Sequence, residues 1–211
     1  MRTLLAAVTL LLTAPLLAAC GGEGDTTATD PAADPGATSG RSMPTEVPAA
    51  RGPVHTAGIA TVLDREGPVL CLGPVAESWP PQCDGPRIVG WQWRDQQGIF
   101  EHQQGVRWGS FWVAGTWDGT TFTYRDAIAS ALYDPMPAEP SPLPEPAVRH
   151  SSAELEEIAG EVGDLPGALS VYTDAGHVLV DVVYDDGSLQ AWADDTYGAD
   201  VVVLRPALLD G

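Results

Sequence analysis

The sequence predicts a mainly β protein, a small barrel or sandwich followed by a small α+β domain. Short apolar and β-branched runs separated by turn residues fill residues 53–134, and such spacing is typical of a barrel or sandwich. Residues 150–211 instead indicate a helix, two strands, a helix and a strand, the order of a helices-on-sheet domain. Gly, Pro, Ala and acidic residues dominate 20–52 and 135–149, so we expect a disordered N-terminal linker and a stiffer Pro-rich one.

Residues 1–19 have the features of a secretory signal. A positive start precedes an apolar run from Leu4 to Leu17, which is shorter than the ~20 residues that a membrane-spanning helix needs. The run ends in Leu17-Ala18-Ala19-Cys20, which resembles the lipobox of bacterial lipoproteins. The resemblance implies cleavage before Cys20, lipid on the Cys20 thiol, and a mature chain anchored on the extracytoplasmic face of the cell membrane. The alternative is an ordinary secretory signal that leaves Cys20 as a free thiol.

The chain has three cysteines, and the lipobox resemblance accounts for one of them. Cys71 and Cys83 remain, and we expect them to form a disulfide in the oxidising compartment that an exported protein enters. Closing a loop of this length contributes roughly 3 kcal/mol in the chain-entropy model. The alternative is a two-thiolate metal site, which neither a C-x-x-C spacing nor an adjacent histidine favours.

The charge of the chain excludes one class of partner. It carries 29 acidic and 10 basic residues, a formal net charge of -19, and every basic residue is an arginine. Because such a surface repels phosphate backbones, we expect no nucleic-acid binding. It also repels anionic headgroups, so contact with the membrane is expected through lipid on Cys20.

The strands of residues 53–134 are expected where apolar residues recur. The expected strands span 55–63, 69–72, 87–93, 111–117 and 120–124. Asp118-Gly119 separates the last two, and this dipeptide favours a two-residue hairpin turn.

Tryptophan is concentrated in the same part of the chain. Six of the seven tryptophans lie there: Trp79, Trp91, Trp93, Trp108, Trp112 and Trp117. The interpretation we favour is that they fill the core of a small β domain. The alternative is a platform for a sugar or another flat ligand, with Trp91, Trp93 and Trp112 as candidate ligand-binding residues. In a strand Trp91 and Trp93 share a face, so both should be buried or both exposed.

Several short motifs surround these tryptophans. They are Leu70-Cys71-Leu72-Gly73, Glu77-Ser78-Trp79-Pro80-Pro81-Gln82-Cys83, Gly85-Pro86, Gly90-Trp91 and Gly115-Thr116-Trp117-Asp118-Gly119. Together they resemble a module of uncharacterised lipoproteins from high-GC Gram-positive (actinobacterial) bacteria, over roughly residues 55–125. The resemblance implies a disulfide-pinned β domain and assigns no activity.

The elements of residues 150–211 follow from local signals. Ser151 and Glu154 form a capping-box pattern before a helical repeat that Gly163 can end. Strands are expected over 168–173, 177–184 and 201–204, and a second helix from about Asp186 to Gly198. The apolar face of that helix consists of Leu189, Trp192, Ala193 and Thr196.

The sequence contains no catalytic motif that we can identify. The four histidines, His55, His102, His150 and His177, have no metal-ligand spacing, and neither a nucleophile elbow nor a phosphate-binding glycine loop occurs. Asp185-Asp186 and Asp194-Asp195 lie at opposite ends of one expected helix, too far apart to bind one cation together. Asp181, in an apolar strand, either faces solvent or is a buried functional carboxylate. We therefore expect no metal and no cofactor.

These patterns favour a non-enzymatic, membrane-anchored envelope protein that binds a partner protein, a cell-wall glycan or a small ligand. One alternative is a cell-wall hydrolase whose carboxylates come together only on folding. Another is an accessory role in a membrane complex.

Overall fold

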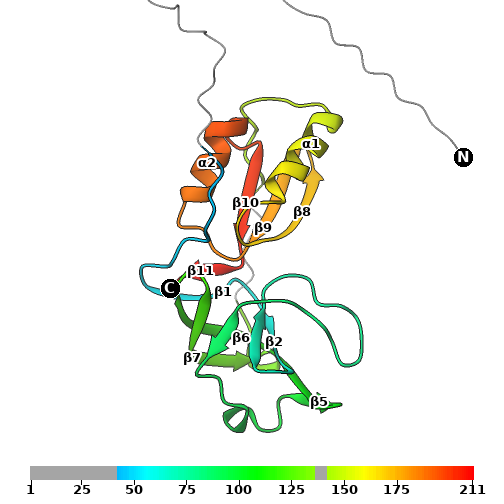
Figure 1. The fold of residues 1–211 in the computed structure, drawn as a ribbon, viewed down its shortest axis with the longest axis vertical. Helices are drawn as coiled ribbons and strands as arrows, with labels where there is room; N and C mark the ends of the chain where they lie inside the picture. The colour runs from blue at the N-terminus through cyan, green and yellow to red at the C-terminus, as the bar shows by residue number, and fades with distance from the viewer. Residues whose placement is uncertain (1–41, 136–141) are drawn as a thin grey trace, which may run out of the picture. The chain divides into compact units, whose positions relative to one another are not determined.

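The computed structural model describes residues 42–135 and 142–211. The expected signal, the expected lipobox Leu17–Cys20 and the first part of the expected linker lie outside the described residues. The described chain is mainly β, with two sheets and two α-helices (Figure 1). None of its helices is long and apolar enough to cross a membrane.

The larger sheet contains eight strands of the described chain. They are β1 (Pro53–Thr56), β2 (Ala60–Asp64), β3 (Pro68–Cys71), β4 (Arg87–Val89), β5 (Glu101–Gln103), β6 (Val106–Trp117), β7 (Thr121–Ala129) and β11 (Leu208–Asp210). Five of them close into a barrel in the order β6-β2-β3-β4-β7, because β7 pairs with both β4 and β6. The β4–β7 pair is parallel and the other pairs of the barrel are antiparallel. Of the two predicted alternatives, a small barrel or a sandwich, the structure therefore has the barrel, with the five-stranded Greek-key architecture found in OB-folds.

Strand β6 organises this sheet, because its 12 residues pair with β1, β2, β5 and β7. Alternate side chains along β6 point into the barrel, where Phe111, Val113 and Trp117 are buried. The core around them is completed by Val62, Leu70, Ile88 and Phe122. The apolar runs of the sequence supply the large side chains that are buried in this core.

The single strand expected over 55–63 is interrupted. It forms β1 and β2, which both run antiparallel to β6, with Ala57, Gly58 and Ile59 between them. Thr56 Oγ1 accepts a hydrogen bond of 3.0 Å from the Val113 amide, so a side chain replaces a backbone carbonyl at the break.

The β6–β7 turn lies one residue later than expected, with Gly119 and Thr120 at its centre. The Asp118 amide donates to the Thr121 carbonyl at 3.3 Å, and Gly119 has a φ of 99°. Asp118 Oδ1 accepts from the amides of Thr121 and Thr120, and these bonds lower the pKa of Asp118.

The second sheet has the order β10-β9-β8 and carries both α-helices. Its elements are α1 (Ser152–Val162), β8 (Ala168–Asp174), β9 (His177–Val182), α2 (Ser188–Tyr197) and β10 (Val202–Pro206). The predicted α-β-β-α-β order is confirmed, and so is the capping box, in which Ser151 Oγ accepts from the Glu154 amide and Glu154 Oε2 accepts from the Ser151 amide. Both helices share one core with Val178, Val180 and Val182, so they cover the same face of the sheet. Thr196 differs from the expectation, because it is exposed.

The last strand connects the second sheet to the barrel. After β10 the chain continues into β11, which pairs with β1, and Leu208 is fully buried in the barrel core. The Tyr184 hydroxyl donates to Asp210 Oδ1 at 2.9 Å. Burial and the bond to Asp210 raise the pKa of Tyr184 to about 12.

Residues 42–52 differ from the disordered linker that composition predicts. Met43 packs against the core of the helices, whereas Val47 and Ala50 pack against the barrel core. The Trp117 indole Nε1 donates to the Pro48 carbonyl at 3.0 Å. A few apolar side chains thus hold this segment against both cores.

Candidate functional site

The loop between β3 and β4 is fastened by the predicted disulfide, Cys71–Cys83, which the structure confirms. This loop covers the outer face of β2 and β3, where it encloses a small apolar cluster of Leu63, Cys71, Val106 and Trp108. The disulfide therefore joins the loop to a second, smaller core outside the barrel.

One hollow borders this loop on the side of β4. Its volume is about 770 Å³, and Val69, Pro74 and Val75 form part of its apolar wall. Four charged side chains line it: Arg65, Glu66, Asp84 and Arg87. All four are exposed to solvent.

A second hollow, which we call the Trp79 cleft, has a volume of about 390 Å³. Its lining residues are Arg65, Ser78, Trp79, Pro80, Gln82, Gln104 and Val106, and it shares Arg65 and Gln82 with the first hollow. Trp79 is 62% exposed, yet its ring meets that of the buried Trp108 edge-on at 5.0 Å. This contact supports an indole that remains available to a ligand.

Polar contacts within the loop order the side chains beside Trp79. The Ser78 hydroxyl donates to the Pro80 carbonyl at 2.8 Å, and Gln82 Nε2 donates to Ser78 Oγ at 3.2 Å. The cleft thus combines a supported aromatic ring with amide, hydroxyl and guanidinium groups.

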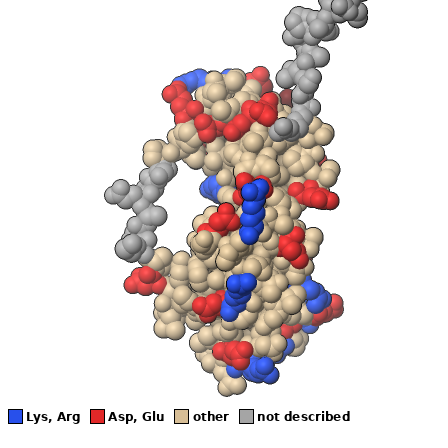
Figure 2. Space-filling view, turned by 90° about the vertical axis from the view of Figure 1, so that its left-hand side faces the viewer, with Lys and Arg blue, Asp and Glu red and all other residues tan. Residues whose placement is uncertain are grey.

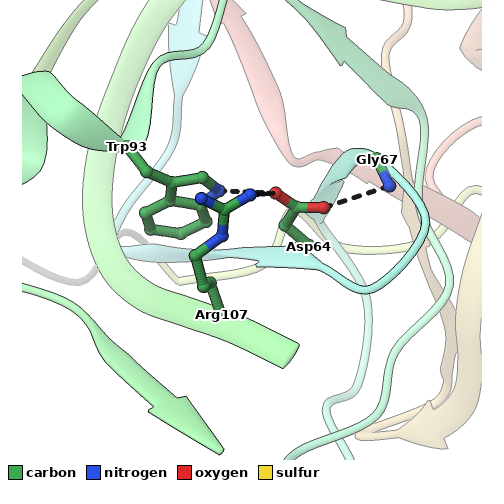
Figure 3. Close-up of polar contacts among 4 residues, drawn as sticks. All are labelled: Asp64, Gly67, Trp93 and Arg107. Atoms are coloured by element: carbon green, nitrogen blue, oxygen red, sulfur yellow. Dashed lines mark hydrogen bonds and ion pairs between the residues drawn. The ribbon is translucent and has the colours of Figure 1, made fainter. Parts of the chain in front are cut away.

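A buried carboxylate holds the β2–β3 turn that carries Arg65. Asp64 is 8% exposed, and its Oδ2 accepts from Trp93 Nε1 at 2.8 Å and from Arg107 Nη2 at 2.7 Å (Figure 3). Its Oδ1 accepts from the Gly67 amide at 3.0 Å. One side chain therefore connects the turn to the segment after β4 and to β6. Sequence analysis missed Asp64 because two of its partners lie 29 and 43 residues away.

Of the three tryptophans named as candidate ligand-binding residues, Trp91 and Trp93 lie together in the barrel core and Trp112 lies apart from them. Trp91 and Trp93 are 5% and 6% exposed, and their rings meet edge-on at 5.5 Å in the barrel core. The expected strand that carried them ends at Val89, and Gly90 with a φ of 87° turns the chain. Trp112 is half-buried on the outer face of β6, stacked against Tyr133 at 6.0 Å. Trp79, which is exposed, was not among the three.

The acidic residues considered for metal binding have structural partners. Asp185 accepts from the amides of Leu189 and Gln190 at the start of α2, and Asp194 accepts from Gln190 Nε2. Asp181, neither fully buried nor free, accepts from Ser170 and Arg205. Within the described ranges, no group of three or more His, Cys, Asp or Glu side chains is arranged to hold a metal ion.

Two carboxylates lie beside the disulfide loop. Glu66 and Asp84 line the larger hollow and are exposed. The pKa of a general acid is usually raised by burial in an apolar site, which these positions do not provide.

No protein-family model, curated protein sequence or solved structure matches this chain.

Proposed function

We propose that this chain is a lipid-anchored extracytoplasmic protein that binds glycan strands of the cell envelope in the Trp79 cleft. The observation that carries the proposal is the exposed Trp79 ring, supported edge-on by Trp108 and surrounded by polar side chains. A sugar presents an apolar face of C–H groups and a rim of hydroxyls. The ring of Trp79 can stack on the C–H face of the sugar. The side chains of Gln82, Gln104 and Arg65 can hydrogen-bond its hydroxyls.

The loop that contributes Arg65 to the cleft supports the same ligand class. OB-fold barrels bind oligosaccharides and oligonucleotides on the face of their second and third strands and at the loop between the first two. Here the corresponding strands are β3 and β4, which line the larger hollow through Val69 and Arg87, and the corresponding loop, Arg65–Gly67, supplies Arg65 to the Trp79 cleft. The analogy rests on architecture alone.

Charge distinguishes between these two ligand classes. The chain has a net charge of -19, and residues 150–211 contain one arginine and no lysine. On the face drawn in Figure 2, acidic side chains crowd the part that carries the helices. Such a surface disfavours a nucleic acid and tolerates a neutral glycan.

Replacing Trp79 by alanine tests the proposal. We expect the full chain to bind purified peptidoglycan and a soluble N-acetylglucosamine trimer, and Trp79→Ala to weaken binding by about tenfold, which corresponds to ~1.4 kcal/mol. Calorimetry with the trimer and co-sedimentation with peptidoglycan measure this change. Trp79 is mostly exposed, so the variant should unfold at the same urea concentration as the parent.

Trp112→Ala is the matched control for this experiment. Trp112 is a half-buried surface tryptophan that does not line the cleft, so its loss should leave affinity for the trimer unchanged. Loss of binding in Trp112→Ala but not in Trp79→Ala would move the site to the outer face of β6. Absence of binding to both probes would reject the glycan proposal.

The anchor has a separate test. The lipobox supports lipid on Cys20, and the Cys71–Cys83 disulfide suits an exported chain. We expect Cys20→Ala to move the protein from the membrane fraction to the soluble fraction, as followed by immunoblotting. Cys83→Ala, which removes a cysteine but leaves the lipobox intact, should stay with the membrane. Retention of Cys20→Ala on the membrane would contradict the anchor.

A further inference from the structure

The floor of the larger hollow, the one of about 770 Å³ beside the disulfide loop, is a row of side chains across three strands. Leu63 on β2 is the Cα partner of Val69 on β3, and Val69 is the partner of Arg87 on β4. Directly opposed residues of neighbouring strands project from the same face of a sheet. Their chain neighbours Leu70 and Ile88 are buried in the barrel core, so the row projects outward, where all three of its residues line the hollow.

The guanidinium of Arg87 lies against the β2–β3 turn. A Cβ built at Gly67 would be 3.6 Å from Arg87 Nη1 and 3.7 Å from Arg87 Nη2. The same turn carries Arg65, which also lines the hollow, and the bond from the Gly67 amide to Asp64 fixes the turn. Two arginines from separate strands and turns therefore border one hollow.

Neither of these arginines is paired with a carboxylate of the described chain. Arg65 and Arg87 are exposed, and no ion pair among the described residues includes either of them. Four other arginines do have an Asp or Glu partner: Arg94, Arg107, Arg149 and Arg205. In a chain with a net charge of -19, two unpaired guanidinium groups at one hollow favour a ligand that carries carboxylates, which arginine binds well.

The other side chains of the hollow restrict the ligand further. Glu66 and Asp84 also line it, so a polyanion without cationic groups would be repelled, whereas a ligand with both carboxylate and ammonium groups would not. Val69, Pro74 and Val75 add an apolar wall. The volume lies within the range of about 300–1,000 Å³ that is typical of ligand pockets. A short peptide with free carboxylates, an amine and alkyl side chains matches this lining.

The hollow is continuous with the proposed glycan site, because Arg65 and Gln82 line both it and the Trp79 cleft. Peptidoglycan carries short peptides with free carboxylates on its sugars. We propose that the larger hollow binds this peptide stem while the Trp79 cleft holds the glycan, and that Arg87 and Arg65 bind the carboxylates of the peptide. This assignment rests on the proposed function and specifies the part of the polymer that the second hollow recognises.

Calorimetric titration of the full chain with a disaccharide tetrapeptide from peptidoglycan tests the assignment. We expect amidation of the free carboxyl groups of this ligand to weaken binding by about tenfold at low ionic strength. Arg87→Ala should weaken binding of the unmodified ligand by a similar factor, and amidation should then have no further effect. Arg87 does not line the Trp79 cleft, so the affinity of Arg87→Ala for the N-acetylglucosamine trimer should equal that of the parent.

Arg125→Ala is the matched control. Arg125 is an exposed arginine of β7 that lines neither hollow, and its replacement removes the same charge. It should bind the disaccharide tetrapeptide as the parent does. Urea denaturation verifies that each variant is folded, and Arg87→Lys, which keeps the charge, should retain part of the affinity that Arg87→Ala loses.

The two ligands separate failure of this inference from failure of the proposed function. Trimer binding by the parent, with equal affinity of the parent and folded Arg87→Ala for the disaccharide tetrapeptide, would overturn the peptide assignment alone. Absence of trimer binding, with Arg87-dependent binding of the free tetrapeptide, would reject the glycan cleft and support the peptide hollow. Tighter binding of a glycerol phosphate oligomer than of the tetrapeptide would make the hollow a phosphate site and overturn the assignment.

Discussion

Replacing Gly115 by alanine is expected to lower the free energy of unfolding by about 3 kcal/mol or more, at the upper end of what overpacking a core costs. A Cβ at this position would overlap the Thr123 carbonyl oxygen and lie 2.6 Å from Phe122 Cε1. Phe122 is fully buried in the barrel core, and Thr123 belongs to the paired strand β7, so neither can move away cheaply. A methyl group is therefore enough to separate β6 from β7.

The position of Gly115 explains why no side chain fits. The register between β6 and β7 shifts at Ala114/Gly115, so that Arg125 is an extra residue on β7. Such a bulge bends the bulged strand, and a glycine inside a strand often marks a place where another backbone approaches closely. Because the β6–β7 pair closes the barrel, the substitution should affect the whole cooperative transition rather than one edge.

Urea denaturation followed by tryptophan fluorescence measures this effect. Gly58→Ala is the matched control, because nothing lies within 4 Å of a Cβ built at Gly58 and its φ is not left-handed. We expect it to change the free energy of unfolding by less than about 0.5 kcal/mol. A Gly115→Ala variant as stable as the parent would show that β6 and β7 can separate at the bulge without cost.

Local signals explain which parts of the fold were predictable. The capping box at Ser151 and Glu154 and the glycine at 163 define α1 within a dozen residues, and the structure confirms that helix. The break between β1 and β2 depends on Val113, which lies 57 residues from Thr56 in the chain. A window of neighbouring residues carries no information about such a contact.

The candidate site also depends on contacts that neighbouring residues in the sequence do not reveal. The disulfide could be predicted because only two cysteines remain once Cys20 is assigned to lipid. The sequence could not show which tryptophan is exposed, because Trp79 lies in a loop whose course depends on the outer face of β2 and β3. Trp91 and Trp93 share burial as alternation in a strand implies, although a glycine turn ends the strand before them.

Replacing Asp64 should lower both the free energy of unfolding and the affinity of the Trp79 cleft for its ligand. We expect Asp64→Ala to cost about 3 kcal/mol of unfolding free energy, because it leaves the Trp93 indole N–H and the Gly67 amide without their acceptor. Trp93 is 6% exposed, so water cannot replace the lost bond without opening the core. The side chain of Arg107 is 47% exposed and can be solvated, so the ion pair itself contributes little.

Two further variants separate these contributions. Arg107→Ala should cost only about 1 kcal/mol in the same urea experiment, and Glu101→Ala, at an exposed acidic residue of β5, almost nothing. If Arg107→Ala is as damaging as Asp64→Ala, the ion pair and not the indole bond stabilises the turn. Because that turn positions Arg65 at the Trp79 cleft, Asp64→Ala should also weaken binding of the N-acetylglucosamine trimer under conditions where the variant is folded. Unchanged binding in the folded variant would show that the position of Arg65 does not contribute to binding in the cleft.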